Sequence, residues 1–395
     1  MVRRHQYLEK LRKTRDMQII KVITGVRRCG KSTLLLQFQE ELLQSGVDAR
    51  QIVSINFEDI ANNPLLEYEA LYNHLLSRLT PGEMTYVFLD EVQNVPQFQK
   101  AVDSLYIQPN VDVYLTGSNA SLLSGELATL LSGRYVEVSM LPLSFAEYHA
   151  LVGGDRRDAW AAYFRRGGFP FAATLEDEEV WRDYLLGIYH TVLLKDIVAR
   201  KGISDVAVLE SVAGFLFDNV GSIVSSKKIA DSLTSDGRKT NSVTVENYIN
   251  ALQESFILYK AGRYNIKGKQ HLKSLEKYYL VDLGLRRMLL GEAAANIGHV
   301  LENIIYLELL RRGFQVQIGK VGDMEIDFIA SKGSDRRYYQ VAASILDPST
   351  FKREIAPLKA VKDNYPKYIL TLDELPMAED GIHQLNVLDY LLSPA

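Results

Sequence analysis

The chain has 395 residues, a hydrophobic fraction of 47% and a charged fraction of 24%, an ordinary balance for a globular protein of roughly two or three domains. Its formal net charge of -4 excludes a general attraction to nucleic acid or anionic membranes, so such a partner would need a local basic patch. No apolar run approaches the ~20 residues of a membrane span. The charged N-terminus lacks the apolar core of a secretory signal, and Cys29 is the single cysteine, so we expect a reducing cytoplasm.

Residues 1–150 alternate short apolar segments with amphipathic ones in which leucines recur at helix spacing. Strand and helix in alternation predict a parallel sheet that helices cover on both faces. The expected strands are residues 19–25, 51–59, 85–91, 111–118 and 134–141.

Residues 25–33, GVRRCGKST, match the pattern GxxxxGK[ST] at every fixed position, between a predicted strand and a predicted helix. The glycines allow backbone N–H groups to point at phosphate oxygens, and the helix N-terminus adds its positive dipole end. Lys31 is expected to reach the β- and γ-phosphates of ATP, and the Ser32 hydroxyl to ligate Mg²⁺. The alternative is a chance glycine-rich turn. The sequence therefore predicts an ATP site formed by Gly25, Val26, Arg27, Arg28, Cys29, Gly30, Lys31, Ser32 and Thr33.

The strand at 85–91 has apolar or aromatic residues followed by Asp90 and Glu91. A buried strand that ends in two carboxylates predicts Asp90 as a Mg²⁺ ligand and Glu91 as the base for the attacking water. An acidic turn after a core strand is the alternative. Ser118 and Asn119 end the next strand, where they are candidates to hold the water or the γ-phosphate, or merely cap the strand.

Cys29 occupies a variable position of the phosphate loop. Arg27, Arg28, Lys31 and the start of the helix all favour a thiolate over a thiol, so we expect a reactive side chain that bound ATP would cover. The competing interpretation is a buried, inert thiol.

Residues 144–204 read as helices only, with a break at GGFP (167–170). From residue 205, three helices and a β-ribbon follow in the order of a winged helix. Thr244, Asn247, Asn250 and Gln253 lie on one side of the third helix, within reach of a major groove. Five acidic residues in this segment are outnumbered by ten basic ones: 227, 228, 238, 239, 260, 263, 267, 269, 273 and 277. These features favour DNA binding, with packing against a protein as the alternative.

A small-residue stretch, 291–298, precedes a last block with a helix (299–312) and strands near 314–318, 325–330 and 337–345. A further helix and a final strand, KYILTL, complete this block, which we expect to be a small α/β domain.

The chain resembles the AAA+ superfamily, and more closely the bacterial and archaeal ATPases that join an AAA+ module to a C-terminal domain of unknown function. The resemblance implies the sheet order 5-1-4-3-2. It also implies that Arg134 reaches a neighbouring subunit's γ-phosphate, although a solvated arginine before a strand is the alternative. The lid arginine stays open among Arg165, Arg166 and Arg200. The resemblance covers the whole chain and rests on ITGVRRCGKSTLL, FLDEVQNV, LTGSNASLLSGELATLLSGRYVEVSMLPLSFAEY and GGFP.

The last block resembles the PD-(D/E)XK nuclease fold through Glu302 in a helix, Asp327 within EIDF in a strand, and Gln340 in the next strand. A working site needs acids on both strands for Mg²⁺ and a lysine two residues beyond the second acid. Here Gln340 replaces that acid and Ala342 the lysine. Glu302 and Asp327, with the Gln340 amide oxygen, would hold a metal weakly, and nuclease activity is not expected.

The predicted fold is α/β: an AAA+ P-loop domain with a parallel sheet (1–150), a helical lid (151–204), a winged helix (205–290) and a nuclease-like domain (296–395). The predicted function is Mg²⁺-dependent binding and hydrolysis of ATP by a DNA-associated cytoplasmic protein. Its expected partners are ATP, DNA and further copies of the chain, with no membrane. The alternative is a nucleotide-dependent protein-interaction switch without DNA binding or nuclease activity.

Overall fold

The computed structural model describes residues 2–119, 133–291 and 296–394, with residues 272–274 described by their backbone alone. The chain divides into two compact units. The first comprises residues 1–142 and 254–256, and the second comprises residues 143–253 and 257–395. Within the described ranges, no helix has both the length and the apolar character that a membrane crossing requires.

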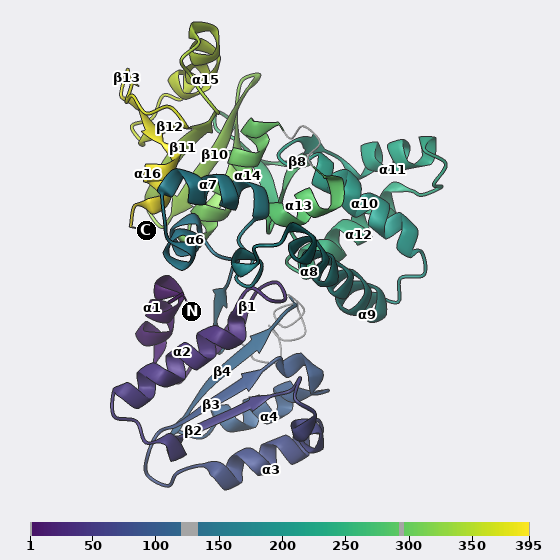
Figure 1. Ribbon diagram of the computed structural model, residues 1–395, viewed down its shortest axis with the longest axis vertical. Coiled ribbons are helices and arrows are strands. Elements are labelled where there is room, and N and C mark those ends of the chain that lie inside the picture. Colours follow the sequence, from purple (N-terminus) through teal and green to yellow (C-terminus); the bar gives the residue numbers. More distant parts are fainter. Residues whose placement is uncertain (1, 120–132, 292–295, 395) are drawn as a thin grey trace. The chain divides into compact units, whose positions relative to one another are not determined.

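The first unit contains a five-stranded parallel sheet in the order β2-β3-β4-β1-β5 (Figure 1). This order confirms the arrangement that the resemblance implied. The strands are β1 (Ile20–Thr24), β2 (Ile52–Asn56), β3 (Thr85–Asp90), β4 (Val111–Gly117) and β5 (Tyr135–Ser139). The helices are α1 (His5–Thr14), α2 (Lys31–Gln44), α3 (Tyr68–Arg78) and α4 (Phe98–Tyr106), with short 3-10 turns η1 (Ala49–Gln51), η2 (Ile60–Leu65) and η3 (Val92–Asn94).

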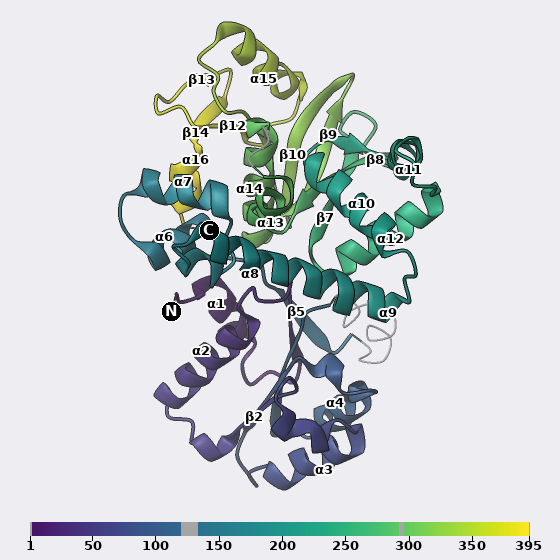
Figure 2. The same ribbon diagram turned by 45° about the vertical axis from the view of Figure 1, so that its right-hand side comes forward.

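Helices cover both faces of this sheet, as the alternating pattern predicted (Figure 2). On one face, leucines of α3 and α4 pack against the valines, leucines and isoleucines of the strands in a continuous apolar core. On the other face, Phe38 of α2 packs against Phe88 and Tyr114, whose rings stack at 4.8 Å. The near-continuous apolar character of β3 and β4 follows from burial on both sides.

Strand register determines which loops meet at each end of the parallel strands. Thr24 pairs with Gly117, and Leu89 pairs with Leu115, so the C-terminal ends of β1, β3 and β4 lie side by side. The segments that follow these strands contain the phosphate loop, Glu91 and Ser118. The parallel topology therefore brings together three motifs that are far apart in the sequence.

The second unit begins with helices, as the sequence predicted. They are α6 (Phe145–Val152), α7 (Arg156–Arg166), the 3-10 turn η5 (Ala172–Thr174), α8 (Glu178–His190), the π-helix η6 (Thr191–Val198) and α9 (Ala199–Lys201). Next come α10 (Val206–Asp218), β6 (Ile223–Val224), α11 (Ser226–Ser235), α12 (Ser242–Glu254), β7 (Leu258–Asn265), β8 (Gln270–Leu280) and α13 (Leu283–Leu290). The last block contains α14 (Ile297–Arg311), β9 (Gln315–Val321), β10 (Met324–Lys332), β11 (Asp335–Val341), α15 (Pro348–Ala360), β12 (Lys367–Thr371), β13 (Ala378–Glu379), β14 (Ile382–Asn386) and α16 (Val387–Leu392).

One nine-stranded sheet runs through this unit in the order β13-β14-β12-β11-β10-β9-β7-β8-β6. Residues 263–265 of β7 pair in parallel with residues 318–320 of β9, so the ribbon and the last block share a sheet. The sequence division at 290–296 placed them in separate domains, because pairing between distant strands leaves no local signal. KYILTL was wrongly predicted as the final strand, since β13, β14 and α16 follow it.

The GGFP break is explained by the buried carboxylate of Asp282, which accepts hydrogen bonds from the backbone N–H groups of Gly168, at 2.5 Å, and Gly284, at 2.8 Å. A Cβ atom on Gly168 would lie 2.5 Å from the carbonyl oxygen of Leu143, so the close approach requires glycine. Burial raises the pKa of Asp282 to about 6, against the lowering effect of these N–H donors. The backbone of the GGFP segment therefore binds the carboxylate of Asp282, which belongs to the same unit.

Candidate active site

The phosphate loop follows β1 and curls into the start of α2. Gly25 has φ 149°, and a Cβ there would lie 2.2 Å from the carbonyl oxygen of Met140, so only glycine fits. Gly30 is left-handed, with φ 105°, directly before Lys31. No side chain in the described ranges caps α2, so its first backbone N–H groups are available to an anion.

The Lys31 ammonium lies within the curl of the loop. It donates hydrogen bonds to the carbonyl oxygens of Gly25, at 3.0 Å, and Val26, at 3.2 Å. Its Nζ is also 3.5 Å from Oε1 of Glu91, and only 2% of the side chain is exposed. A phosphate that binds in the loop would thus meet a buried cation.

Asp90 is 6% exposed and sits among hydroxyl and amide donors. Its carboxylate accepts hydrogen bonds from the hydroxyls of Thr116 and Ser32, and from Nδ2 of Asn56 at 3.2 Å. Burial raises its pKa, which these donors counteract. Ser32 and Asp90, predicted from the sequence as metal ligands, are therefore in contact, and their oxygens are of the type that Mg²⁺ prefers.

Glu91 has a left-handed backbone, with φ 53°, and a carboxylate whose two oxygens have different neighbours. Oε2 accepts hydrogen bonds from the Ser118 hydroxyl, at 3.1 Å, and from Nε2 of Gln93, while Oε1 faces Lys31. Burial would raise the pKa of Glu91, but Lys31, Gln93, Arg27 and Ser118 together hold it below its usual value. The ionised carboxylate is the form that can accept a proton from water.

Sequence reasoning brought most of these residues together but missed Gln93. The Ser118 hydroxyl, a candidate to hold water or phosphate, donates a hydrogen bond to Glu91, and Asn119 lies buried directly after it. Gln93 comes two positions after Glu91 in FLDEVQNV. The sequence shows a polar side chain at this position, but it does not predict the turn that brings Gln93 back to Glu91.

The structure favours the competing interpretation of Cys29, a buried thiol. Its side chain is fully buried, and Sγ lies 3.7 Å from the carbonyl oxygen of Met140. Burial raises the pKa of the thiol more than the charge of Lys31 lowers it. Arg27, by contrast, pairs with Glu58 at 3.0 Å, and Arg28 is exposed.

Arg134 lies near the N-terminal ends of the strands, whereas its own phosphate loop lies at their C-terminal ends. It directly precedes β5, whose first residue Tyr135 pairs with Ile20, while the loop begins beyond Thr24. Four strand steps of ~3.3 Å place these ends about 13 Å apart. The Arg134 side chain is 45% exposed and 3.8 Å from Asp103, with its guanidinium 5.0 Å from the ring centroid of Tyr106.

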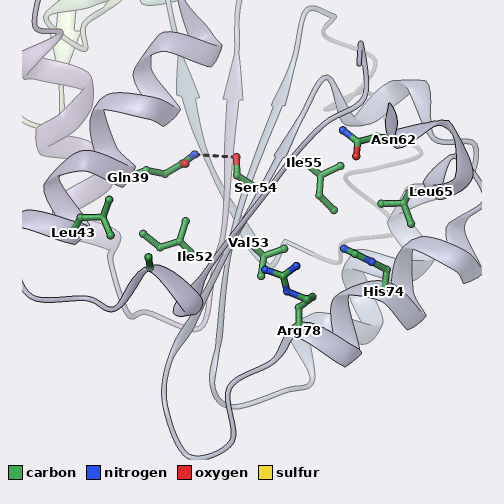
Figure 3. Close-up of a pocket in the computed structure, with 11 residues that line it drawn as sticks. Gln39, Leu43, Ile52, Val53, Ser54, Ile55, Asn62, Leu65, His74 and Arg78 are labelled. Atoms are coloured by element: carbon green, nitrogen blue, oxygen red, sulfur yellow. Dashed lines mark hydrogen bonds between the residues drawn. The ribbon is translucent and has the colours of Figure 1, made fainter. Parts of the chain in front are cut away.

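A separate hollow of about 500 Å³ lies beside β2, the edge strand of the first sheet (Figure 3). Gln39 and Leu43 of α2 line one side, and His74 and Arg78 of α3 line the other. Its lining contains no residue of the phosphate loop, and neither Asp90 nor Glu91. It is therefore distinct from the candidate active site.

Some of the ten basic residues counted between 227 and 277 are buried or already paired, so fewer of them are free at the surface than the sequence suggests. Lys277 is buried, Lys260 pairs with Glu276 at 3.1 Å, and Arg238 donates to the Ala207 carbonyl oxygen. Other cationic side chains are exposed, namely Lys227, Lys228, Lys239, Lys267 and Lys269. On α12, the predicted contact residues Asn247 and Asn250 are exposed, whereas Thr244 and Gln253 are half-buried.

Lys277 instead belongs to a buried cluster with acids of the last block. Its Nζ lies 2.8 Å from Glu325, 3.0 Å from Glu302 and 3.9 Å from Asp327. Burial alone would lower the pKa of Lys277, but the three acids raise it. Burial and the charge of Glu302 raise the pKa of Asp327 well above its usual value. A lysine from β8 thus occupies the space between the acids of the nuclease-like motif.

Both polar atoms of the Gln340 amide have hydrogen-bond partners next to this cluster. Its amide oxygen accepts a hydrogen bond from the backbone N–H of Asp327, at 3.4 Å, and its Nε2 donates to Glu354 at 2.9 Å. The Gln340 oxygen that the sequence offered for a metal is therefore engaged with the backbone.

Comparisons with known proteins fit this geometry. Residues 18–149 match the family model of an AAA domain, and residues 157–296 match a domain of unknown function, DUF8612. An uncharacterized protein of Haemophilus influenzae is 41% identical over 400 residues, which cover 99% of each chain. One of Methanocaldococcus jannaschii is 30% identical over 378 residues, covering 88% of this chain and 81% of that protein.

Among solved structures, the Walker-type ATPase PABY2304 of Pyrococcus abyssi shares 18% identity, over 73% of this chain and 96% of its own, with a TM-score of 0.45. That score is too low for an inference about function. The phosphate loop, the carboxylates at the end of β3, the sheet order and the two relatives agree with one another. The chain is a P-loop protein with an AAA domain, and it belongs to the family that includes the H. influenzae and M. jannaschii proteins.

Proposed function

We propose that the protein is a Mg²⁺-dependent ATPase of the AAA+ type. The observation that carries this proposal is the meeting of Lys31, Ser32, Asp90 and Glu91 at the end of the first sheet. Lys31 would bind the β- and γ-phosphates, and Glu91 would accept the proton of the attacking water. Ser32 and Asp90 would hold Mg²⁺, which neutralises charge on the phosphate oxygens.

The test is ATP hydrolysis by the purified chain with Mg²⁺ and with EDTA, beside Lys31→Ala. We expect hydrolysis that requires Mg²⁺ and is absent from the variant. Phosphate release that is equal in EDTA, or equal in Lys31→Ala, would contradict the assignment.

We further propose that hydrolysis requires a second copy of the chain. Arg134 precedes β5 at the N-terminal ends of the strands, away from its own phosphate loop. It would therefore contact the nucleotide of a neighbouring subunit rather than its own. Its side chain is 45% exposed, and a neighbour's phosphate would compete with Asp103 for the guanidinium. The chain would then act as a homo-oligomer, and its ATPase rate per subunit would rise with protein concentration.

We also propose that the second unit binds DNA through a winged helix. The order α10, β6, α11, α12, β7, β8, with β8 paired to both β6 and β7, supports this fold. Exposed Asn247 and Asn250 on α12 would face a groove, and Lys267 and Lys269 at the ribbon turn would face phosphates. We propose that the nuclease-like block is non-catalytic, because Lys277 fills the space between its acids.

One observation favours the alternative, a switch that grips protein. The outer edge of β7 pairs with β9, so the ribbon is part of a larger sheet rather than a free wing. Reversing the charge of Lys267 and Lys269 distinguishes the two functions. A phosphate-binding ribbon should lose a slope of about 0.9 in log Kd against log salt for each contact removed. An unchanged slope, or no DNA binding by the wild type, would favour the protein switch.

A further inference from the structure

We propose that Gln93 is a positioning residue for ATP hydrolysis: it holds one oxygen of Glu91 so that the other faces the phosphate loop. This inference rests on the proposed ATPase function. Gln93 touches neither the loop nor the residues proposed to hold Mg²⁺ through any contact that the structure records. Its effect would therefore be exerted through Glu91.

The backbone after Glu91 is shaped to return Gln93 to the carboxylate. Glu91 adopts a left-handed conformation, which is sparsely populated for residues other than glycine and persists only where the surroundings hold it. The 3-10 turn η3 follows at once, closed by a hydrogen bond from the Asn94 N–H to the Glu91 carbonyl oxygen at 3.1 Å. The turn brings the Gln93 amide beside the side chain two residues before it.

Two donors then converge on one oxygen of Glu91. Nε2 of Gln93 and the hydroxyl of Ser118 both donate to Oε2, and Nε2 is itself 3.4 Å from the Ser118 oxygen. Oε1 is left facing Lys31, at 3.5 Å. Two donors on one oxygen fix the rotation of the carboxylate, so the base presents a defined oxygen toward the phosphates.

The Gln93 amide is oriented so that its Nε2 donates to Glu91, which leaves its Oε1 without a hydrogen bond within the described part of the chain. Its Oε1 is buried and has no hydrogen-bond partner among the residues that the structure describes. Turning the amide over would place that oxygen against Oε2 of Glu91, and two acceptors would then repel each other. Leaving a buried acceptor unpaired is unfavourable, which indicates that the donated bond to Glu91 outweighs it.

The test is Gln93→Met, which keeps the length of the side chain and removes the donor. We expect kcat to fall on the order of 10-fold, a fraction of the 10²–10⁴ that a positioned base contributes, while the Kd for ATP stays within about twofold. In a Glu91→Gln background the same substitution should cost less than about twofold, because the residue acts through Glu91. A merely structural role would lower kcat by the same factor in both backgrounds.

Two further variants make the test decisive. Asn94→Leu removes a side-chain bond to the Phe57 carbonyl oxygen from the same turn, so it controls for disturbance of η3 and should leave kcat within about twofold. Gln93→Glu keeps shape and length but sets a second carboxylate against Glu91, so it should lower kcat at least as much as Gln93→Met. It carries the test if Gln93→Met does not fold. Wild-type kcat in these Gln93 variants, or equal losses in both backgrounds, would overturn the proposal, whereas absence of wild-type hydrolysis would overturn the ATPase function as well.

Discussion

Replacing Lys277 with methionine should destabilise the second unit severely. The lysine supplies the positive charge among three carboxylates, and 5% of its side chain is exposed. Methionine fills nearly the same volume, so the change removes the charge without opening a large cavity. Glu302, Asp327 and Glu325 would then repel one another in a poorly hydrated space. Removing one partner from a buried ion pair costs about 3–5 kcal/mol, and we expect a loss in that range.

The pH dependence of this loss has a definite sign. Burial and Glu302 already raise the pKa of Asp327 above its usual value, and Lys277 opposes that rise, so removing Lys277 would raise the pKa of Asp327 further in the folded state. A folded state that holds protons more tightly than the unfolded state becomes less stable as pH rises. The deficit of Lys277→Met should therefore be larger at pH 8 than at pH 5.

Urea unfolding followed by circular dichroism at both pH values measures the deficit. Lys260→Met is the matched control, because Lys260 lies on the same ribbon and pairs with Glu276 while 43% exposed. An exposed pair contributes at most about 1 kcal/mol, so this variant should stay near the wild type. A loss below about 1 kcal/mol in Lys277→Met, or a larger loss at pH 5 than at pH 8, would refute the reasoning.

Three further outcomes are expected. Cys29 should resist maleimide in the folded protein and take one adduct in urea, measured by intact mass, because it is buried; rapid native labelling would place the thiol at the surface. Asp282→Asn should lower the free energy of unfolding by about 1–3 kcal/mol, because an amide nitrogen would face the backbone N–H donors; wild-type stability would remove the carboxylate from that role. Arg134→Ala should bind ATP yet hydrolyse it poorly, and mixing it with Lys31→Ala should restore part of the activity; no recovery in a co-assembled mixture would exclude action between subunits.

The first unit was largely predictable because its signals are local. The phosphate loop and the Asp90–Glu91 pair are each defined by a few adjacent residues, and buried parallel strands read as apolar runs. The order of the strands came from the resemblance rather than from any periodicity. What the sequence could not supply was the conformation between motifs, such as the left-handed turn at Glu91 that returns Gln93 to the carboxylate.

The second unit was less predictable because its decisive contacts join distant residues. Lys277 read as one more surface cation, since burial in a strand depends on which helix and strand cover it. The parallel pairing of β7 with β9 is set by residues more than fifty positions apart. The burial of Cys29 was not predicted for a related reason. Charges nearby in the sequence suggested a thiolate, but the side chain is fully buried, and burial raises the pKa of the thiol more than the charges of Lys31 and Arg4 lower it.

The most direct test of the central claim compares ATP binding and turnover in the wild type and in Glu91→Gln. Glu91 accepts bonds from Ser118 and Gln93 and faces Lys31, a geometry suited to a base. We predict that the wild type hydrolyses ATP with Mg²⁺, and that the variant binds ATP with similar affinity but turns over roughly 10²–10⁴ slower. Near-normal turnover in the variant, or no hydrolysis by the wild type at any protein concentration, would contradict the account.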